Sequence, residues 1–486
     1  MKPDSSRRYL LCALMAVCVA RLWVMPLGSS FWVDETATAF VVSHGAHDPS
    51  FAVAPQVPMS IYYVLPRTST RIFGRSEAAY RLPSLAALAL AVWLIGRLAA
   101  RLIHAEAGWF AAFACLALKG FDYEAADARP YALGTAVACA AVWFLVRWLD
   151  EARWRDAALF AAAAALLWRV HLLYWPFYGV LAVYTAARLT RRETRVTWGA
   201  AAAVYAAVGL AVVPVAAQVW SLRGEAGAHV MAAPPGARAL ADSLKLALVA
   251  AAGAGAWAWA GRRKRGNVVS LTVAVLCAAW WIGTPAALFA FSRIGGASVF
   301  LERYLTLALP GAALAATAVA AVFLPASQWR NAAAVLGAGV LLLLGRWGVL
   351  WPPHHGSDWR GAAAAINRDV LPDTPLVCPS PFLEARSPVW RPDAPATGFL
   401  YAHLAAYPLA GKVYAFPYAD SPEAERWAEE LMHRALEPSG RFAIYGAARE
   451  AAFWREWFGA RAEFAEWRAR GLGEFGDVSV AILERR

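Results

Sequence analysis

Long apolar segments recur along the first 351 residues, and most approach the roughly 20 residues that a helix needs to cross a bilayer core. The first has no small-residue cleavage site after its apolar run, so we expect a retained helix rather than a signal peptide. The pattern predicts a mainly α-helical, polytopic membrane protein with about eleven transmembrane helices. We place them at 9–27, 78–102, 105–120, 129–149, 156–169, 171–189, 198–220, 239–261, 267–291, 303–324 and 331–351.

The pattern changes after Trp351, where residues 352–357 have the composition of a linker. Short apolar runs then alternate with amphipathic helical stretches, which is typical of a small α/β domain. We therefore expect a transmembrane domain over 1–351 and a soluble α/β domain over 352–486. Its expected strands are 375–378, 412–416, 441–445 and 478–483, and its expected helices are 358–368, 421–436 and 447–458.

Basic residues gather in alternate connections between the spans, which predicts orientation by the positive-inside rule. With the N-terminus in the cytoplasm, an odd number of spans leaves the C-terminal domain extracytoplasmic, and the protein is expected in the cytoplasmic membrane. The outer side then receives Asp34-Glu35, the segments 119–129 and 293–304, the loop 221–238 and the surroundings of His171. The inner connections carry Arg97, Arg101, Arg147, Arg153, Arg155, Arg188, Arg191, Arg192, Arg195, Arg262, Arg263, Lys264, Arg265 and Arg330.

Composition agrees with a membrane protein, since 60% of the residues are hydrophobic and 16% are charged. The net charge of +12 is explained by these inner-side arginines beside anionic lipid headgroups, so we expect no nucleic-acid partner. Of the six cysteines, only Cys378 lies outside the predicted spans. This pattern predicts neither a disulfide framework nor a Cys-x-x-Cys metal site.

Two outer segments concentrate the polar residues that could do chemistry. The first loop, 28–77, is far longer than the usual connection of about 2 to 8 residues, and its segment 58–65 has the aromatic content of an interfacial element. It also carries the pair Asp34-Glu35, and carboxylates beside a membrane helix require a hydrated pocket. The second segment, 119–131, places Asp127 and Arg129 immediately before a helix that Pro130 would begin.

The order of motifs along the chain resembles the bacterial family 39 glycosyltransferases, relatives of protein O-mannosyltransferases and aminoarabinose transferases with the GT-C membrane fold. The resemblance is dense in residues 28–135 and weaker beyond. It rests on Trp32-Val-Asp-Glu35, Pro58 with Tyr62-Tyr63, Phe73-Gly-Arg-Ser-Glu-Ala-Ala-Tyr-Arg-Leu-Pro-Ser84, Asp127-Ala-Arg-Pro-Tyr-Ala-Leu133, His171, Glu302-Arg-Tyr-Leu305 and Asp358-Trp-Arg360.

The resemblance implies transfer of a sugar from a polyprenyl-phosphate donor to an envelope acceptor, which could be a glycolipid, a glycan or a protein. Asp34 would act as the general base or orient the acceptor hydroxyl, and Glu35 would support the acceptor or a cation. The donor phosphate would be bound first by Arg129 and second by Arg303 with Tyr304. Supporting positions are Asp127, Tyr131 and His171.

Each of these residues also has a purely structural interpretation. Asp34 and Glu35 could cap an interfacial helix, Arg129 could pair with Asp127 to stabilise a loop, and Arg303 could anchor the chain at the interface. The motifs establish no cofactor. A divalent cation is conceivable at His44, His47 and Asp48, although a solvated loop explains these three residues equally well.

The chain departs from the family pattern at two places. Residues 54–58 read Ala-Pro-Gln-Val-Pro instead of a His-Pro-Pro type, so the motif does not define the acceptor pocket. Residues 124–126 read Glu-Ala-Ala instead of a Tyr-Ser-Gln type. The second departure indicates a donor sugar different from that of relatives that carry the family pattern. A polyprenyl-linked sugar flippase or transporter and a non-catalytic envelope-assembly protein are the alternative classes, since either would bind the same lipid.

Overall fold

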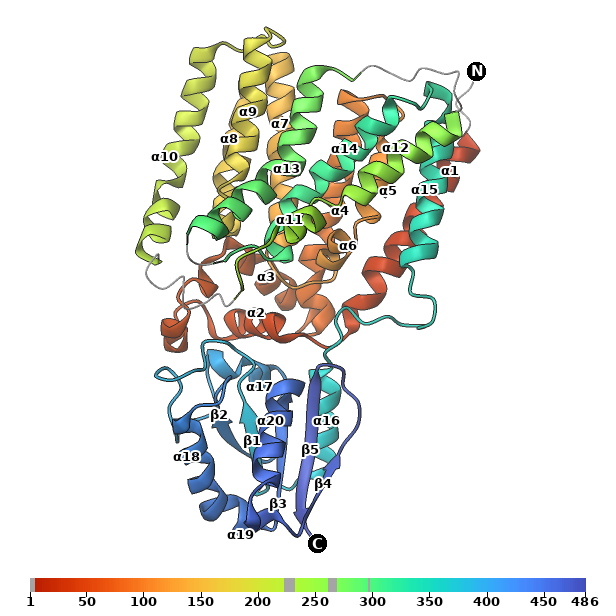
Figure 1. The fold of residues 1–486 in the computed structure, drawn as a ribbon. Helices are drawn as coiled ribbons and strands as arrows, with labels where there is room; N and C mark the ends of the chain where they lie inside the picture. The colour runs from red at the N-terminus through yellow and green to blue at the C-terminus, as the bar shows by residue number, and fades with distance from the viewer. Residues whose placement is uncertain (1–4, 223–231, 261–268, 296–297) are drawn as a thin grey trace. The chain divides into compact units, whose positions relative to one another are not determined.

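The computed structural model describes residues 5–222, 232–260, 269–295 and 298–486 (Figure 1). It divides into two compact units. The helical unit consists of Met1–Leu27, Ser60–Tyr62 and Arg81–Pro352, and the sheet unit consists of Gly28–Met59, Tyr63–Tyr80 and Pro353–Arg486. The first outer loop and the C-terminal domain thus belong to the same unit.

The helical unit is a bundle whose core is built from alanine, leucine and aromatic side chains. Among the described residues, six helical stretches are long and apolar enough to cross a membrane: Arg8–Gly28, Glu77–Leu102, Tyr131–Glu151, Trp198–Leu222, Leu271–Ile294 and Glu302–Ala321. Other predicted spans coincide with shorter helices. The helices are α1 (Ser5–Val19), α4 (Glu77–Leu102), α5 (Gly108–Leu116), α6 (Lys119–Ala125), α7 (Tyr131–Glu151), α8 (Trp154–Val170), α9 (Phe177–Thr190), α10 (Trp198–Leu222), α11 (Ala237–Ser243), α12 (Leu246–Ala260), α13 (Leu271–Ile294), α14 (Leu309–Ala321) and α15 (Trp329–Leu344).

One predicted helix, 239–261, is broken in the structure. It consists of α11 and α12, which meet at a bend of 50° and together count as a seventh possible span. Lys245 lies at the break with φ of 50°, a left-handed conformation that interrupts the hydrogen-bond ladder of an α-helix. The predicted basic cluster 262–265 and part of the loop 221–238 lie outside the described residues.

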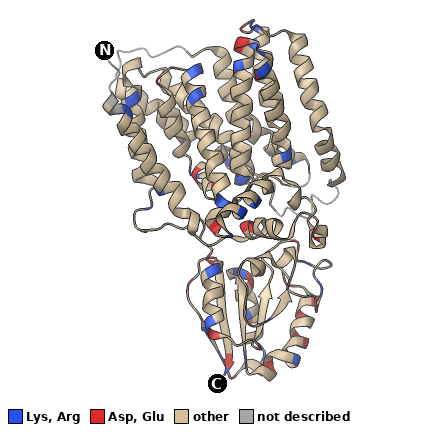
Figure 2. Ribbon diagram, turned by 180° about the vertical axis from the view of Figure 1, so that it is seen from behind, with Lys and Arg blue, Asp and Glu red and all other residues tan. Residues whose placement is uncertain are grey.

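Charged residues are sparse along the helices of the helical unit and gather at helix ends (Figure 2). Several arginines predicted for the inner side are paired there with carboxylates. Arg101 Nε lies 2.9 Å from Asp150 Oδ2, and Arg188 Nη2 lies 2.6 Å from Asp150 Oδ1. These arginines therefore join helices to one another, in addition to any contact with lipid headgroups.

The sheet unit contains a five-stranded mixed sheet with the order β2-β1-β3-β5-β4. β1 pairs in parallel with β2 and β3, and β5 pairs antiparallel with β3 and β4. The strands are β1 (Pro375–Pro379), β2 (Lys412–Phe416), β3 (Arg441–Ala447), β4 (Trp467–Gly471) and β5 (Val478–Arg485). The predicted class is confirmed: a mainly helical multi-pass membrane protein with a small C-terminal α/β domain.

Helices cover both faces of this sheet because successive strand residues point to opposite sides. Val377 packs with the aromatic side chains of α18 (Pro422–Leu431) and α20 (Ala448–Gly459), whereas its neighbours Leu376 and Cys378 pack with α16 (Trp359–Asp369). The result is a three-layer α/β/α arrangement with an apolar cluster on each side of the sheet.

The first outer loop folds onto this α/β layer. Its helix α2 (Val33–His44) packs against α17 (Ala402–Ala406), and farther along the loop Ser50 Oγ accepts a hydrogen bond of 2.9 Å from the Phe399 N–H (Figure 1). The predicted interfacial segment forms short 3₁₀ turns followed by α3 (Val64–Phe73). Val64, Ile72 and Phe73 of α3 are exposed, as expected for an element in contact with lipid.

Candidate functional site

Five of the residues singled out in the sequence come together in the helical unit: Arg129, Tyr131, His171, Arg303 and Tyr304, which we call the cationic cluster. Ring centroids of His171 and Tyr131 are 5.5 Å apart, and those of His171 and Tyr304 are 5.1 Å apart. Arg129 Cζ lies 6.0 Å from the Tyr131 ring centroid, and Arg303 Cζ lies 5.3 Å from that of Tyr304. Two guanidinium groups are therefore held by aromatic surfaces around one imidazole.

These side chains lie at positions where one helix ends and the next begins. Arg129 precedes Pro130, the N-cap of α7, and Arg303 lies on the 3₁₀ helix η8 (Glu302–Ala308) that leads into α14. His171 ends α8 in extended conformation, and its Nδ1 accepts a hydrogen bond of 3.3 Å from the Leu173 N–H. The neutral imidazole accordingly carries its proton on Nε2.

The positive charges of Arg129 and Arg303 act on the half-buried His171 and disfavour a protonated imidazole. The imidazole is therefore neutral at physiological pH, and it can offer a phosphate a hydrogen bond but no charge. The positive charge of the cluster comes from the two arginines alone.

Carboxylates lie behind the cationic cluster. Burial above all, and next the charge of Asp127, raise the pKa of Glu124, while Arg129 and Arg303 oppose this shift. Glu124 and Asp127 are 3% and 1% exposed, so the two arginines have acidic neighbours that water hardly reaches. Glu124 was noted in the sequence only as a departure from the family pattern.

Two supports of the cluster could not be recognised from the sequence. Ser84 Oγ donates a hydrogen bond of 3.5 Å to the Arg129 carbonyl, and Tyr62 Oη lies 3.3 Å from Ser84 Oγ. Tyr62 and Ser84 belong to the quoted motifs, but spacing alone gave them no role. On α7, a Cβ added at Gly134 would overlap the ring of Tyr174, whose centroid is 5.1 Å from that of His171.

The two ends of α7 differ in character. The cationic cluster surrounds its first residue, Tyr131, while Asp150 and Glu151 at its last turn pair with Arg101. A helix of 21 residues is about 30 Å long, which matches a bilayer core. The cluster and the ion-paired arginines therefore lie at opposite ends of a membrane-spanning helix.

The acidic pair lies in the sheet unit, at the first turn of α2. Glu35 is fully buried, and its Oε2 accepts a hydrogen bond of 3.2 Å from the Trp32 N–H. This contact caps the helix and gives Glu35 a structural role. Asp34 is half-buried on the same turn, where the positive end of the helix dipole favours its carboxylate.

The three metal candidates of the first loop have local partners or lie in solvent. His44 Nδ1 lies 3.2 Å from the Phe40 carbonyl, and its ring stacks on that of Phe40. Asp48 accepts hydrogen bonds from the backbone N–H and the hydroxyl of Ser50, which lower the pKa of its carboxyl group. His47 is exposed. No cofactor is established for the protein.

The predicted site residues thus form two groups. The cationic cluster, with Asp127, belongs to the helical unit, whereas Asp34, Glu35, His44, His47 and Asp48 belong to the sheet unit.

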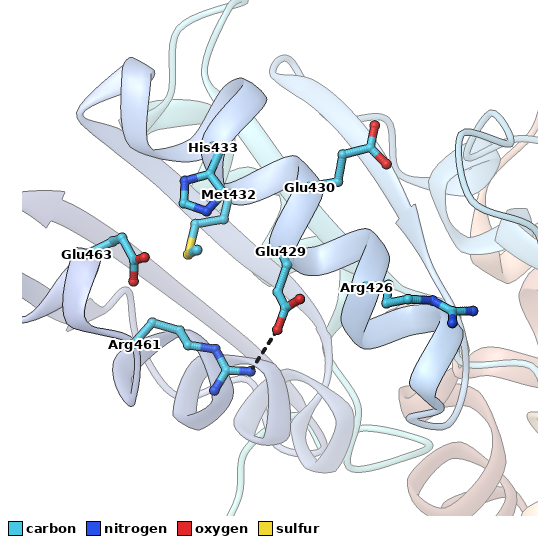
Figure 3. A pocket seen from close by; sticks show the side chains of 7 residues that line it. All are labelled: Arg426, Glu429, Glu430, Met432, His433, Arg461 and Glu463. Carbon is cyan, nitrogen blue, oxygen red and sulfur yellow. Dashed lines mark ion pairs between the residues drawn. The ribbon is translucent and has the colours of Figure 1, made fainter.

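A surface depression of the C-terminal domain offers a third place for a ligand (Figure 3). It is lined by α18, the π-helical turn that follows it, and the segment around Arg461. Arg461 Nη2 lies 3.6 Å from Glu429 Oε1, and its guanidinium also stacks over Trp457. The lining of the depression contains both arginines and glutamates, so the depression has none of the cationic character of the cluster in the helical unit.

Comparison with known proteins supports the resemblance seen in the motifs. Residues 56–220 match the family model described as dolichyl-phosphate-mannose-protein mannosyltransferase. This segment contains Arg129, Tyr131 and His171 but less than half of the chain. No curated protein matches the chain in sequence.

The fold is shared with two crystal structures of ArnT from Cupriavidus metallidurans, one bound to undecaprenyl phosphate and one in the apo state. Each superposes with a TM-score of 0.56 at 13% sequence identity, over 97% of this chain and 97% of ArnT. The similarity covers both the helices and the C-terminal domain. The expected resemblance to GT-C glycosyltransferases is confirmed by the family model and by this fold.

Proposed function

We propose that this protein is an integral-membrane glycosyltransferase that uses a polyprenyl-phosphate sugar. The observation that carries the proposal is the cationic cluster, two aromatic-bound arginines at one end of a membrane-spanning helix, in a fold that ArnT uses with undecaprenyl phosphate. Because positive residues favour the cytoplasmic side, the ion-paired end of α7 faces the cytoplasm and the cluster faces outward. The proposed location is the outer face of the cytoplasmic membrane.

In the proposed reaction, the acceptor hydroxyl oxygen attacks the anomeric carbon of the donor sugar. The bond between that carbon and the phosphate oxygen breaks, and the acceptor proton passes to the Asp34 carboxylate. The lipid phosphate leaves with an additional negative charge. Arg129 and Arg303 stabilise this charge, because their planar guanidinium groups fit phosphate oxygens, and neutral His171 with Tyr304 adds hydrogen bonds.

The sugar is a hexose or a pentose, and the acceptor is an envelope glycolipid, glycan or protein. The Glu-Ala-Ala sequence before Asp127 places a buried acid, Glu124, beside the cationic cluster. An acid at this position favours a donor whose sugar offers hydroxyl or amino donors toward it.

A divalent cation near the acceptor side is best tested at Glu35 and His354. A carboxylate oxygen of Glu35 and a ring nitrogen of His354 lie within 4.8 Å of each other in the sheet unit. Carboxylate and imidazole are common ligands of Mn²⁺ and Zn²⁺. If a cation takes part, chelation lowers the transfer rate and one of these ions restores it.

The test is transfer by the purified protein in vesicles that contain a labelled polyprenyl-phosphate hexose or pentose and envelope extract from a strain lacking the gene. We expect mass spectrometry to show one sugar gained by an acceptor that the deletion strain leaves unmodified. Asp34→Asn should lower this rate about 10³-fold, because a carboxylate base contributes on that order, without changing thermal stability. Donor binding without any transfer would indicate the flippase or assembly alternative instead.

A further inference from the structure

The stretch of chain just before Asp34 is held by three residues from distant parts of the sequence, Glu77, Arg360 and Tyr407. Glu77 Oε1 accepts a hydrogen bond of 2.9 Å from Arg360 Nη1 and another of 2.9 Å from the Tyr407 hydroxyl. We call this trio the Glu77 clamp. All three residues lie in the sheet unit.

The clamp binds the backbone that leads into α2. The Tyr407 hydroxyl accepts a hydrogen bond of 2.8 Å from the Phe31 N–H, and Arg360 Nη2 donates one of 3.0 Å to the Gly28 carbonyl. The backbone N–H of Arg360 donates another of 3.0 Å to Ser30 Oγ. Gly28, Ser30 and Phe31 are therefore each bound by a residue more than 300 positions away in sequence.

The clamp is shielded from water mainly around Glu77 and Tyr407. The side chain of Glu77 is 14% exposed and that of Arg360 is 49% exposed, so the hydrogen bond from Tyr407 to Glu77 is better protected than the ion pair with Arg360. Burial above all, and next the charge of Glu77, raise the pKa of Tyr407, which keeps its hydroxyl neutral and able to donate. The Phe31 ring packs edge-on against Tyr80 at 5.4 Å and lies 6.1 Å from the Tyr407 ring.

The clamp acts close to the proposed base. Phe31 is followed by Trp32, the N-cap of α2, whose ring stacks on His355 at 5.2 Å, and Asp34 lies on the first turn beyond it. A shift of the Phe31 backbone would therefore move the start of α2 and the Asp34 carboxylate with it. Displacements of about 1 Å in catalytic groups can cost on the order of 10²-fold in rate.

We infer that Glu77, Arg360 and Tyr407 are positioning residues, through which the C-terminal domain holds Asp34 in the geometry that acceptor activation requires. This inference rests on the proposed function, because it assigns the clamp to the acceptor side of that reaction. It also gives the C-terminal domain a role in catalysis without any contact with the reacting atoms.

The decisive variant is Tyr407→Phe, which removes the hydroxyl shared by Glu77 and Phe31 and keeps the ring. We expect kcat for transfer to fall about 10- to 100-fold, while the KM for the polyprenyl-phosphate donor stays at its wild-type value. Tyr401→Phe is the matched control. It removes a hydroxyl that donates a 2.7 Å bond to the Phe416 carbonyl in the core of the same domain, so it should lower stability and leave kcat unchanged.

A double-mutant cycle separates positioning from a general loss of structure. If Tyr407 acts through Asp34, Tyr407→Phe has no further effect on the residual rate of Asp34→Asn, measured in long incubations. Glu77→Gln, which keeps an oxygen for the Tyr407 hydroxyl, should retain more activity than Glu77→Ala.

Two kinds of result would overturn these conclusions, and they can be told apart. If Tyr407→Phe keeps the wild-type kcat, or lowers the rate of Asp34→Asn by the same factor as that of the wild type, the positioning role is wrong and the proposed function stands. If the wild type transfers no sugar, or Asp34→Asn transfers at the wild-type rate, the proposed function itself fails and the inference fails with it.

Discussion

The cationic cluster of the helical unit and the Asp34 segment of the sheet unit are held in place by different physical means. Arg129 and Arg303 lie against aromatic rings, at the ends of helices that pack through alanine and leucine side chains. The chain before Asp34 is held by hydrogen bonds to Arg360 and Tyr407, both of which also donate a hydrogen bond to Glu77. The cationic cluster is thus a product of apolar packing, whereas the Asp34 segment depends on polar bonds between distant segments, so the two can be damaged separately.

The first variant tests the proposed donor side, where a large loss of rate is expected. Arg129→Gln removes a guanidinium proposed to stabilise the departing phosphate, and we expect kcat to fall about 10²- to 10³-fold. Arg129→Lys should recover only part of this loss, because an ammonium cannot bind two phosphate oxygens in the same plane. Rates measured over a range of donor concentrations test this. An unchanged rate in Arg129→Gln would show that the cluster serves only structure.

Packing behind the cluster can be broken without removing any charge. Gly134→Val places carbon atoms where the Tyr174 ring lies, and we expect a loss of about 3 kcal/mol in stability together with a loss of donor binding. Gly179→Val is the matched control, since a Cβ at Gly179 meets no atom within 4 Å. Thermal unfolding of the detergent-purified variants measures both. Equal melting temperatures for the two variants would contradict the close packing at Gly134.

Acid weakens the sheet unit through a buried histidine. His403 is fully buried beside Trp359 and Tyr445, and burial lowers its pKa to about 3. In the unfolded chain the pKa of a histidine is about 6.5, so the unfolded chain is protonated at a higher pH than the folded one. The sheet unit therefore has its full stability above about pH 6.5 and loses stability as the pH falls below this value.

Between pH 7 and pH 5 we expect a loss of about 2 kcal/mol in the stability of the sheet unit. Hydrogen exchange of β1 and β3, corrected for intrinsic rates, measures it in the intact protein. In His403→Phe the dependence should largely disappear. A variant with the pH dependence of the wild type would assign the effect to other groups.

The smallest effect concerns the cap of α2. Glu35→Ala removes the acceptor for the Trp32 N–H, so we expect about 1 kcal/mol less protection of α2 against hydrogen exchange. Glu35→Gln keeps an oxygen at this position and should retain the protection. If Glu35→Gln nevertheless loses transfer activity, the charge of Glu35 has a role beyond the cap, as a cation ligand or toward the acceptor.

Much of the fold could be predicted because apolar runs and helix-breaking residues are local signals. The strands around Val377, Tyr414, Ile444 and Val480 were all expected. β4 was missed because it is a short edge strand, Trp-Arg-Ala-Arg-Gly, in which only Trp467 is buried, so it lacks the apolar run of the other strands. The break in 239–261 was missed because nothing in an apolar run marks Lys245 as left-handed.

The site was less predictable because it depends on which helix ends meet. Motif order suggested Arg129, Tyr131, His171 and Arg303 one at a time, but their proximity follows from the packing of α7, α8 and α14. The Glu77 clamp could not be predicted from the sequence, because Tyr407 is outside every quoted motif and is separated from Phe31 by 376 positions. Glu35 was expected in the chemistry, and its bond to Trp32 adds a structural role.

The fixed length of α7 makes bilayer thickness a variable of the proposed reaction. Its ion-paired last turn is anchored by Arg101 and Arg188, while the cationic cluster surrounds its first residue. In a bilayer thicker than the helix, the arginines of the cluster would sink below the plane of the lipid phosphates, and the bilayer or the helix tilt must adjust at an energetic cost for every ångström of mismatch. Acyl-chain length of the host membrane would thereby change how readily the protein binds the proposed lipid-linked donor.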